Sequence, residues 1–283
     1  MEVQANAKLN LTLDVLGSRE DGYHDLRMVM QSVSLSDRVR LIPMQWGEVH
    51  ARSNLSFLPG GEKNLAVKAA LCFYRHLGRP AGGLEIELEK RIPVCAGMGG
   101  GSSDAAAVLR ALNEAEGDPL TLEELARVGE QVGSDVPYCV LGGTALAEGR
   151  GELLTPLTPL PPCWVVVCKP DFPISTPALF ARIDTIRLRR RPDTAGVLAS
   201  LEEGDLEGVA RRLYNVFEDA LPPRQQARVS AIKSTMIHCG ALGASMTGTG
   251  PAAFGLFDRE DCAEAAREAL ADWGSEIFLT HTV

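Results

Sequence analysis

Residues 93–104 read Pro93-Val94-Cys95-Ala96-Gly97-Met98-Gly99-Gly100-Gly101-Ser102-Ser103-Asp104, and this glycine-rich stretch decides the fold of the chain. The apolar residues after it recur at the i, i+3, i+4 and i+7 spacing of an α-helix: Ala105, Val108, Leu109 and Leu112. Serine and aspartate are helix-capping residue types, so we expect the glycines to form a loop that leads into a helix N-terminus. Such a terminus presents unpaired N–H groups and the positive end of the helix dipole, and glycine lets the backbone approach a bulky anion. The stretch therefore predicts a phosphate-binding loop.

Other interpretations of the glycine-rich stretch are an exposed turn or a close contact between a helix and a strand. It is not a P-loop, because no lysine follows the glycines. It differs from the dinucleotide-binding fingerprint, since Ser102 stands where a third glycine belongs. The preceding Leu84, Ile86 and Leu88 alternate with glutamates, as in a strand with one solvated face, whereas the central strand of a dinucleotide fold is buried on both faces. A dinucleotide oxidoreductase is therefore the weakest alternative.

Residues 93–106 follow the pattern Pro-x-x-x-Gly-Met-Gly-Gly-Gly-Ser-Ser-Asp-Ala-Ala. This pattern resembles the second signature motif of the GHMP kinases, a superfamily that includes galactokinase, homoserine kinase, mevalonate kinase and phosphomevalonate kinase. The triple glycine followed by Ser-Ser-Asp is most similar to the branch that phosphorylates 4-diphosphocytidyl-2-C-methyl-D-erythritol. Met246-Thr247-Gly248-Thr249-Gly250-Pro251 is similar to the third family motif. With the segments described below, the resemblance runs from Ala5 to Phe257.

The resemblance implies an α+β chain with the two-domain GHMP-kinase fold. An N-terminal ribosomal S5 domain 2-like ATP-binding domain is expected over residues 1–155, and a C-terminal ferredoxin-like α+β domain over residues 156–283. A boundary there agrees with the proline-rich segment at residues 155–162. Hydrophobic periodicity predicts strands over 3–15, 29–41, 84–88, 163–168, 252–257 and 277–282. It predicts helices over 65–77, 122–132, 196–213, 224–239 and 259–273, the last one ended by Gly274.

Composition and charge limit the class of protein. The 283 residues, with 45% hydrophobic and 23% charged, suit one large globular domain or two of moderate size. A net charge of −9 argues against nucleic-acid binding, which requires a basic surface. The seven cysteines form no Cys-x-x-Cys pair and indicate neither a disulfide framework nor a zinc site. Without a leader or a membrane-length apolar run, we expect a cytoplasmic protein with no nucleic-acid or membrane partner, as a monomer or weak homodimer.

The first predicted strand carries two candidate active-site residues. From Val3 to Val15 apolar residues alternate with polar ones, which predicts one core face and one polar face. Lys8 and Asn10 project side by side from the polar face, where simple solvation is the alternative to a function. Lys8-Leu9-Asn10-Leu11 resembles the family's Lys-x-Asn-Leu segment, which implies that Lys8 is catalytic and that Asn10 contacts the substrate.

Asp135 lies just after a predicted helix, in Gly133-Ser134-Asp135-Val136-Pro137. Its sequence context alone favours a turn or capping aspartate. The segment matches the family's Gly-Ser-Asp-Val-Pro, whose aspartate is the proposed catalytic base and also contacts the substrate. The resemblance thus implies that Asp135 accepts the hydroxyl proton, while Lys8 stabilises the developing alkoxide and keeps Asp135 ionised. Whether Asp135 is a true base or mainly orients the hydroxyl stays open, because a loose transition state needs little activation of the nucleophile.

The resemblance implies ATP as the phosphoryl donor, bound by the backbone of residues 93–103. Asn64, which is typical of a helix N-cap, would lie near the nucleotide. Lys90 ends the preceding strand beside the expected phosphate site, although a Lys-Arg pair there is more often solvated. Mg²⁺ would bridge the β- and γ-phosphates with Ser103 as a candidate contact, and the sequence identifies no carboxylate ligand for it.

The resemblance also implies a small, cytidine diphosphate-linked acceptor. Tyr23 and His24 would hold the cytosine base, with Phe180 stacked opposite Tyr23, an interaction worth roughly 1–3 kcal/mol per base. Thr176 would face the substrate. The alternatives are a surface Tyr-His pair and an ordinary core phenylalanine.

Thr247 and Gly248 of the third motif would also contact the substrate. The motif departs from the family at Thr247 and Thr249, where serines are usual, and the glycine loop departs at Cys95 (often glycine) and Met98 (usually leucine). The side chain of Cys95 would either crowd the nucleotide or point into the core. Two alternative functions remain: a GHMP kinase acting on mevalonate, homoserine or a sugar, and a non-catalytic ligand sensor on the same fold.

Overall fold

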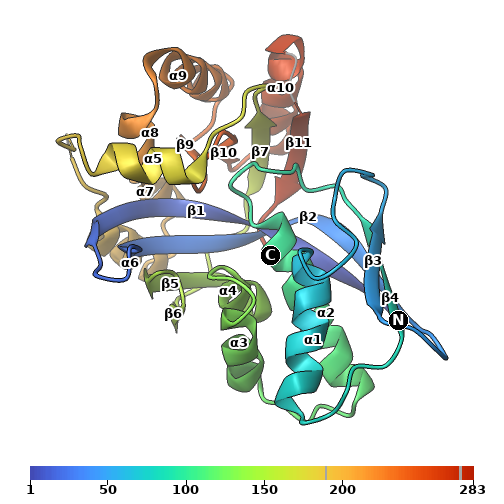
Figure 1. Cartoon of the computed structure of the whole chain (residues 1–283). Helices are drawn as coiled ribbons and strands as arrows, with labels where there is room; N and C mark the ends of the chain where they lie inside the picture. The colour runs from blue at the N-terminus through green and yellow to red at the C-terminus, as the bar shows by residue number, and fades with distance from the viewer. Residues whose placement is uncertain (189, 274–275) are drawn as a thin grey trace. The chain divides into compact units, whose positions relative to one another are not determined.

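The computed structural model describes residues 1–188, 190–273 and 276–283 (Figure 1). The chain forms two compact units. The first contains Met1–Ala7, Leu35–Ile92 and Gly99–Gly142, and the second contains Lys8–Ser34, Pro93–Met98 and Gly143–Val283. Two long strands, β1 (Glu2–Ser18) and β2 (His24–Pro43), contribute residues to both units. The domain boundary expected at residue 155 stays a prediction.

The sheet of the first unit is built on β4 (Leu84–Glu89), which lies parallel to β3 (Val49–Ser53) and antiparallel to the second half of β2. The three apolar residues of β4 are buried, as the alternating pattern predicts. Its glutamates point to the opposite face, where Glu85 and Glu87 both pair with Arg52. The strand is therefore half-solvated, as predicted, because one face covers the core and the other carries exposed ion pairs.

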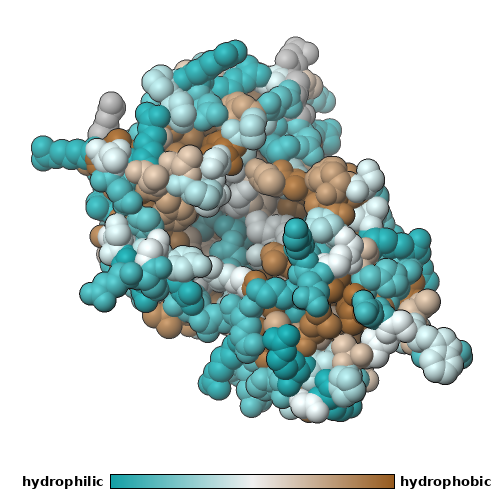
Figure 2. All heavy atoms as spheres, in the orientation of Figure 1, coloured by the Kyte–Doolittle hydropathy of each residue, from teal (hydrophilic) through white to brown (hydrophobic). Residues whose placement is uncertain are grey.

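Four helices complete the first unit: α1 (Leu65–His76), α2 (Gly100–Ala115), α3 (Leu122–Glu130) and α4 (Val136–Leu141). Helix α1 packs against α2, and α4 packs against both α2 and α3. Two predicted start signals are confirmed: Asn64 caps α1, and Thr121 forms a capping box with Glu124 at the start of α3. The outer face over α3 is mostly hydrophilic, whereas hydrophilic and hydrophobic residues are mixed over α1 (Figure 2).

Helix α2 begins earlier than the sequence suggests. Its N-cap is Gly99 in the left-handed conformation, with φ 69°, and none of the described side chains caps it. Ser102, Ser103 and Asp104 lie inside the helix, so two of the glycines expected in the loop are helical instead. Only glycine enters the left-handed region without steric cost, which explains why a glycine occupies the N-cap position.

In the second unit, the first half of β2 pairs antiparallel with β5 (Thr144–Gly149), which pairs in turn with β6 (Leu153–Pro156). On the other side β2 lies next to β1, and β1 pairs parallel with the short strand β8 (Tyr214–Asn215). This sheet brings residues near 12 and 214 together, a contact between segments about 200 residues apart in the chain.

The second sheet of this unit confirms the ferredoxin-like expectation. Its strands are β7 (Trp164–Lys169), β9 (Gly243–Met246), β10 (Ala253–Phe257) and β11 (Glu276–His281). All pairings are antiparallel in the spatial order β11-β7-β10-β9, which is 4-1-3-2 in chain order. Helices α9 (Pro223–His238) and α10 (Glu260–Leu270) pack against these strands and against each other (Figure 1).

The prediction of a single helix over 196–213 is wrong in one respect. The segment forms two helices, α6 (Thr194–Glu202) and α7 (Leu206–Arg211). Gly204 has a positive φ of 67° and Asp205 caps α7 by accepting a hydrogen bond from the Gly208 N–H. A glycine followed by a capping residue ends one helix and starts the next. Short helices α5 (Thr176–Ile183) and α8 (Phe217–Ala220) complete the unit.

Helix α10 continues into a 3₁₀ turn at Ala271–Trp273, and the stop expected at Gly274 lies outside the described residues. Among the described helices, none is both long enough and apolar enough to cross a membrane.

We expect the Thr121→Ala substitution to lower the free energy of unfolding by about 1 kcal/mol, because it removes the capping-box acceptor at the start of α3. Chemical denaturation of the purified protein measures this change. Thr158→Ala, in an exposed loop, is the matched control and should leave the free energy unchanged. Equal stabilities of the two variants would contradict the capping role.

Candidate active site

The glycine-rich loop has the backbone conformation that an anion-binding loop requires. Cys95, Gly97 and Gly99 all have positive φ, at 55°, 80° and 69°. Loops with such left-handed residues aim successive N–H groups at a common point and bind anions. Helix α2 follows directly, and the first N–H groups of a helix have no partner within it. The local structure therefore agrees with the phosphate-binding loop that the sequence predicts.

Cys95 is the one non-glycine residue of this loop with a positive φ, and its side chain is exposed. The alternative that the Cys95 side chain points into the core is therefore wrong. Met98, three residues later in the loop, is buried. A side chain in the left-handed region costs roughly 1–2 kcal/mol because Cβ approaches the following carbonyl oxygen. The strain explains why glycine suits this position.

In the second unit, Lys8 and Asn10 are both buried and in contact. The Lys8 ammonium donates to Asn10 Oδ1 at 2.7 Å, with 4% of Lys8 exposed. The same oxygen accepts from the Gly248 N–H at 2.9 Å. The Lys8 N–H also donates to Met98 O at 3.1 Å, so β1 is tied to the middle of the glycine loop. A buried ammonium requires such partners, because desolvation of an unpaired charge is costly.

The turn at residues 247–250 lies against the first half of the glycine loop. Thr247 Oγ1 donates to Gly97 O at 3.2 Å, and a Cβ on Gly97 would overlap the Thr247 carbonyl. A Cβ on Gly248 would lie 2.7 Å from Gly97 O. Two backbones approach closely here, and only glycine at both positions permits it. The second and third motifs, 150 residues apart, are thus adjacent in this unit.

From Lys8 to Asp14 the polar face of β1 is buried, which corrects the alternative of simple solvation for Lys8 and Asn10. Thr12 is fully buried and its Oγ1 accepts from the Val29 N–H, while Asp14 pairs with Arg191 at 2.6 Å. Both faces of β1 are therefore covered between Lys8 and Asp14, and the polar residues of this part are buried as hydrogen-bonded groups.

The predicted base-binding residues also lie in the second unit. The His24 ring is 4.8 Å from the Phe180 ring, and His24 Nε2 is hydrogen-bonded to Asp184 at 2.8 Å. Tyr23 is 55% exposed, with the Arg150 guanidinium 5.3 Å from its ring centre. The structure thus brings Phe180 to His24. The predicted stack of a base between Tyr23 and Phe180 stays a prediction.

Thr176 begins α5 and is exposed, and its hydroxyl is hydrogen-bonded to that of Thr249 at 2.8 Å. This contact links α5 to the turn at residues 247–250. The structure thus connects Thr176, which is predicted to contact the substrate, with the third motif.

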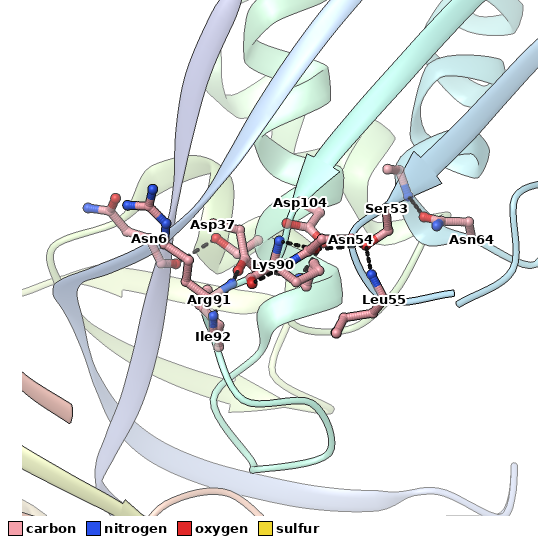
Figure 3. Close-up of polar contacts among 12 residues, drawn as sticks. Asn6, Asp37, Ser53, Asn54, Leu55, Asn64, Lys90, Arg91, Ile92 and Asp104 are labelled. Carbon is pink, nitrogen blue, oxygen red and sulfur yellow. Dashed lines mark hydrogen bonds and ion pairs between the residues drawn. The ribbon is translucent and has the colours of Figure 1, made fainter. Parts of the chain in front are cut away.

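In the first unit, Lys90 is buried between two carboxylates (Figure 3). Its ammonium contacts Asp37 Oδ2 and donates to Asp104 Oδ2 at 2.5 Å. Asp37 Oδ1 also accepts from the N–H groups of Arg91 and Ile92, at 2.5 and 2.8 Å. These contacts fix the backbone just before Pro93, where the glycine loop starts. Lys90 is therefore part of a buried charge cluster and not solvated.

Burial raises the pKa of Asp104 to about 8, against the opposing effect of Lys90 and with a smaller rise from Asp37. A protonated Asp104 leaves the cluster with one ammonium and one carboxylate, which avoids an uncompensated buried charge. Asp104 Oδ1 has no hydrogen-bond partner among the described residues, which agrees with a neutral carboxyl group.

The role of Asp37 in this charge cluster is not among the sequence predictions, although the sequence contains a signal for it. Val33, Leu35, Val39 and Leu41 occupy alternate, apolar positions of β2, and Asp37 stands in the middle of that series. A charged residue at a core-facing position needs a buried partner of opposite charge. The sequence does not identify that partner as Lys90, 53 residues away.

The other candidates of the first unit have defined local roles. Asn64 accepts from the Ala66 N–H and donates to Pro59 O (Figure 3). Ser103 is buried and its Oγ donates to Asn6 O at 2.5 Å. Asp135 is half-buried at the N-cap position of α4, but among the described residues its side chain makes no cap hydrogen bond. The structure therefore agrees with the turn predicted at Asp135, whereas the capping hydrogen bond of that alternative is not formed.

Comparison with known proteins identifies two family models in this chain. "GHMP kinases N terminal domain" matches residues 64–143, and "GHMP kinases C terminal" matches residues 197–276. The two matches lie on either side of residue 155, and the boundary itself stays a prediction.

The chain is similar along its whole length to known sequences and to a solved structure. The 4-diphosphocytidyl-2-C-methyl-D-erythritol kinase of Exiguobacterium sibiricum is 43% identical over 98% of this chain and 96% of that protein. The protein of the same name from Clostridium tetani is 40% identical over 100% of both chains. A crystal structure of 4-(cytidine 5'-diphospho)-2C-methyl-D-erythritol kinase has a TM-score of 0.83 at 35% identity, and the match covers 100% of this chain and 99% of that one.

We expect Cys95→Gly to be more stable than Cys95→Ala by about 1 kcal/mol, because glycine relieves the left-handed strain that alanine retains. The alanine variant is the matched control, since both substitutions remove the thiol. Denaturant titration of the two proteins measures the difference, and an alanine variant as stable as the glycine variant would argue against strain at this position.

We expect the stability of the parent protein to depend on pH through Asp104. The unfolded chain releases this proton near its ordinary pKa of 3.8, whereas the folded protein holds it up to about pH 8. The folded state binds more protons in between, so this group's contribution to stability decreases as pH rises from about 4 to about 8.

Asp104→Asn should remove this pH dependence, because an amide mimics the protonated carboxyl group. The measurement is the free energy of unfolding across that pH range. Asp258→Asn, which removes one exposed carboxylate, controls for net charge and should keep the slope of the parent. An Asp104→Asn variant with an unchanged slope would refute the assignment.

Proposed function

The chain belongs to the GHMP kinase family, and we propose that it transfers the γ-phosphoryl group of ATP to the 2-hydroxyl of 4-diphosphocytidyl-2-C-methyl-D-erythritol. The products are the 2-phosphate and ADP, a step of non-mevalonate isoprenoid synthesis. The observation that carries this proposal is the full-length similarity, at about 40% identity, to proteins that bear the name of this activity. The buried Lys8–Asn10 pair against the glycine loop supports it from the structure.

Asp135 and Lys8 act on the acceptor hydroxyl in this proposal. Asp135 accepts the hydroxyl proton or orients the hydroxyl, and Lys8 stabilises the negative charge that develops on the oxygen. Asn10 supports this role of Lys8, because its Oδ1 fixes the ammonium at 2.7 Å. Fixed charges of this kind stabilise a transition state without reorganisation during the reaction.

The backbone of residues 93–103 holds the phosphates of ATP in this proposal. Three left-handed residues and the N-terminus of α2 supply N–H donors and a positive dipole end. Positioning of the phosphates and neutralisation of their charge are the main needs of phosphoryl transfer. Asn64 and Lys90 stay predictions as nucleotide contacts.

Mg²⁺ is proposed as the cofactor, and when bound it would neutralise part of the charge of the ATP phosphates. Among the described residues, no group of three or more His, Cys, Asp or Glu side chains is arranged to hold a metal ion. Ser103 stays a prediction as a contact of the ion, since its side chain is buried and its Oγ donates to Asn6 O.

The cytidine part of the acceptor distinguishes this proposal from other GHMP kinases. Tyr23 is exposed and Phe180 is half-buried beside His24, so aromatic and polar groups suited to a base are present in the second unit. Thr176, Thr247 and Gly248 are proposed as further acceptor contacts. Mevalonate, homoserine and sugars carry no base, so an acceptor without cytidine should bind far more weakly.

We expect Asp135→Asn and Lys8→Ala each to lower kcat by at least about 100-fold, because each removes an acid–base or charge-stabilising group. The measurement is ADP release from the purified enzyme with ATP, Mg²⁺ and the diphosphocytidyl acceptor. Asp258→Asn and Lys63→Ala, both at exposed positions, are matched controls and should retain the kcat of the parent.

The outcomes separate the alternatives. Full turnover in both variants would contradict the assigned roles but not the family. No ADP release by the parent with any acceptor would favour the ligand-sensor alternative. Equal turnover of mevalonate or homoserine would instead favour another kinase of the family.

A further inference from the structure

A short segment that the motifs do not include, Asn215–Glu218, holds the turn that follows β9. Asn215 is fully buried. Its Nδ2 donates to Met246 O and to Gly248 O, both at 2.8 Å, and its Oδ1 accepts from the Phe217 N–H at 3.0 Å. Both N–H donors and the oxygen of this buried amide are thus hydrogen-bonded, which fixes both the segment and the turn.

Glu218 binds the two residues that precede the same turn, Ser245 and Met246. Its Oε1 accepts from Ser245 Oγ at 3.1 Å and from the Met246 N–H at 2.8 Å. Its Oε2 pairs with Lys233 at 2.5 Å. Charge-assisted hydrogen bonds are stronger than neutral ones, so this carboxylate anchors the backbone at Ser245 and Met246.

The turn at residues 247–250 contacts Asn10, which holds the Lys8 ammonium. The Gly248 N–H donates to Asn10 Oδ1 at 2.9 Å, and Asn10 Oδ1 also accepts from the Lys8 ammonium at 2.7 Å. One oxygen thus binds both the turn and the ammonium. A displacement of Gly248 therefore changes the position or the hydrogen bonding of the oxygen that holds Lys8.

We propose that Asn215 is a positioning residue for phosphoryl transfer, acting through the turn and Asn10 on Lys8, with Glu218 as its support. The proposal rests on the function proposed above. Asn215 is suited to this because it bonds two carbonyls on either side of Thr247, so it sets the shape of the turn as well as its location. Misplacement of a catalytic group by about 1 Å can cost about 100-fold in rate.

The test is a double-mutant cycle between Asn215→Ala and Lys8→Ala. We expect Asn215→Ala to lower kcat by about 10- to 100-fold. In the double variant we expect little further loss beyond that of Lys8→Ala, because the two residues act through one pathway. A purely structural defect would add to the loss from Lys8→Ala, so losses that multiply in the double variant would overturn the proposal.

Asn113→Ala is the matched control. Asn113 is also a buried asparagine whose amide bridges a loop, through Asp118 and Leu120, but it lies in the first unit and outside the proposed site. It should lose stability in denaturant titrations, keep the kcat of the parent, and add no interaction with Lys8→Ala.

A second pair of variants applies if Asn215→Ala does not fold. Glu218→Ala removes the acceptor of the Met246 N–H, whereas Lys233→Ala removes only the ion pair to the same carboxylate. We expect the first to lower kcat by about tenfold or more and the second to stay within about threefold of the parent. Equal losses in the two variants would contradict a role of the turn.

Amide hydrogen exchange tests the turn without substrate. In Asn215→Ala or Glu218→Ala, the amides of Met246 and Gly248 should exchange faster than in the parent, and in Asn113→Ala they should not. If the parent does not turn over the proposed acceptor, the proposed function fails, and this measurement alone decides whether the segment holds the turn. Unchanged exchange at both amides would overturn the proposal.

Discussion

A single buried oxygen, Asn10 Oδ1, holds the second unit's part of the site together. It accepts from the Lys8 ammonium and from the Gly248 N–H, and Thr247 Oγ1 lies 3.4 Å away. An ammonium that is 4% exposed is stable only where fixed acceptors replace water. The turn after β9 therefore lies against β1, where the Gly248 N–H can bind this oxygen. Glycine is needed at positions 97 and 248, because the backbones of the turn and of the glycine loop approach each other without room for a Cβ.

The first unit also contains a buried lysine, whose charge is compensated by carboxylates and not by an amide oxygen. Lys90 is buried between Asp37 and Asp104, so a second ionised carboxylate would leave one negative charge unpaired. The raised pKa of Asp104 resolves this by keeping the carboxyl group protonated. Asp37 meanwhile binds the two N–H groups that precede the loop (Figure 3). Burial of charge and the starting point of the loop are thus set by the same three residues.

The features that sequence predicted are those determined by neighbours in the chain. The cap at Asn64, the capping box at Thr121 and the alternation of β4 depend on residues within a few positions of one another, and each is confirmed. The burial of the polar face of β1 depends instead on Arg191 and the turn at 247–250, which periodicity cannot reveal. The break between α6 and α7 is a different case, since Gly204 and Asp205 carried a readable signal that a longer helical pattern obscured.

Phe180, which is proposed to bind the base, is also packed against other aromatic side chains of the second unit. Its ring is half-buried, lies 4.8 Å from His24, and packs edge-on at 4.8 Å against the buried Phe217. Phe217 belongs to the same segment, Asn215–Glu218, that holds the turn at Met246 and Gly248. This segment therefore supports Phe180, which is proposed to bind the base, and also Lys8, through Gly248 and Asn10. Because packed side chains transmit displacements rather than absorb them, a shift of this segment would alter both sets of residues together.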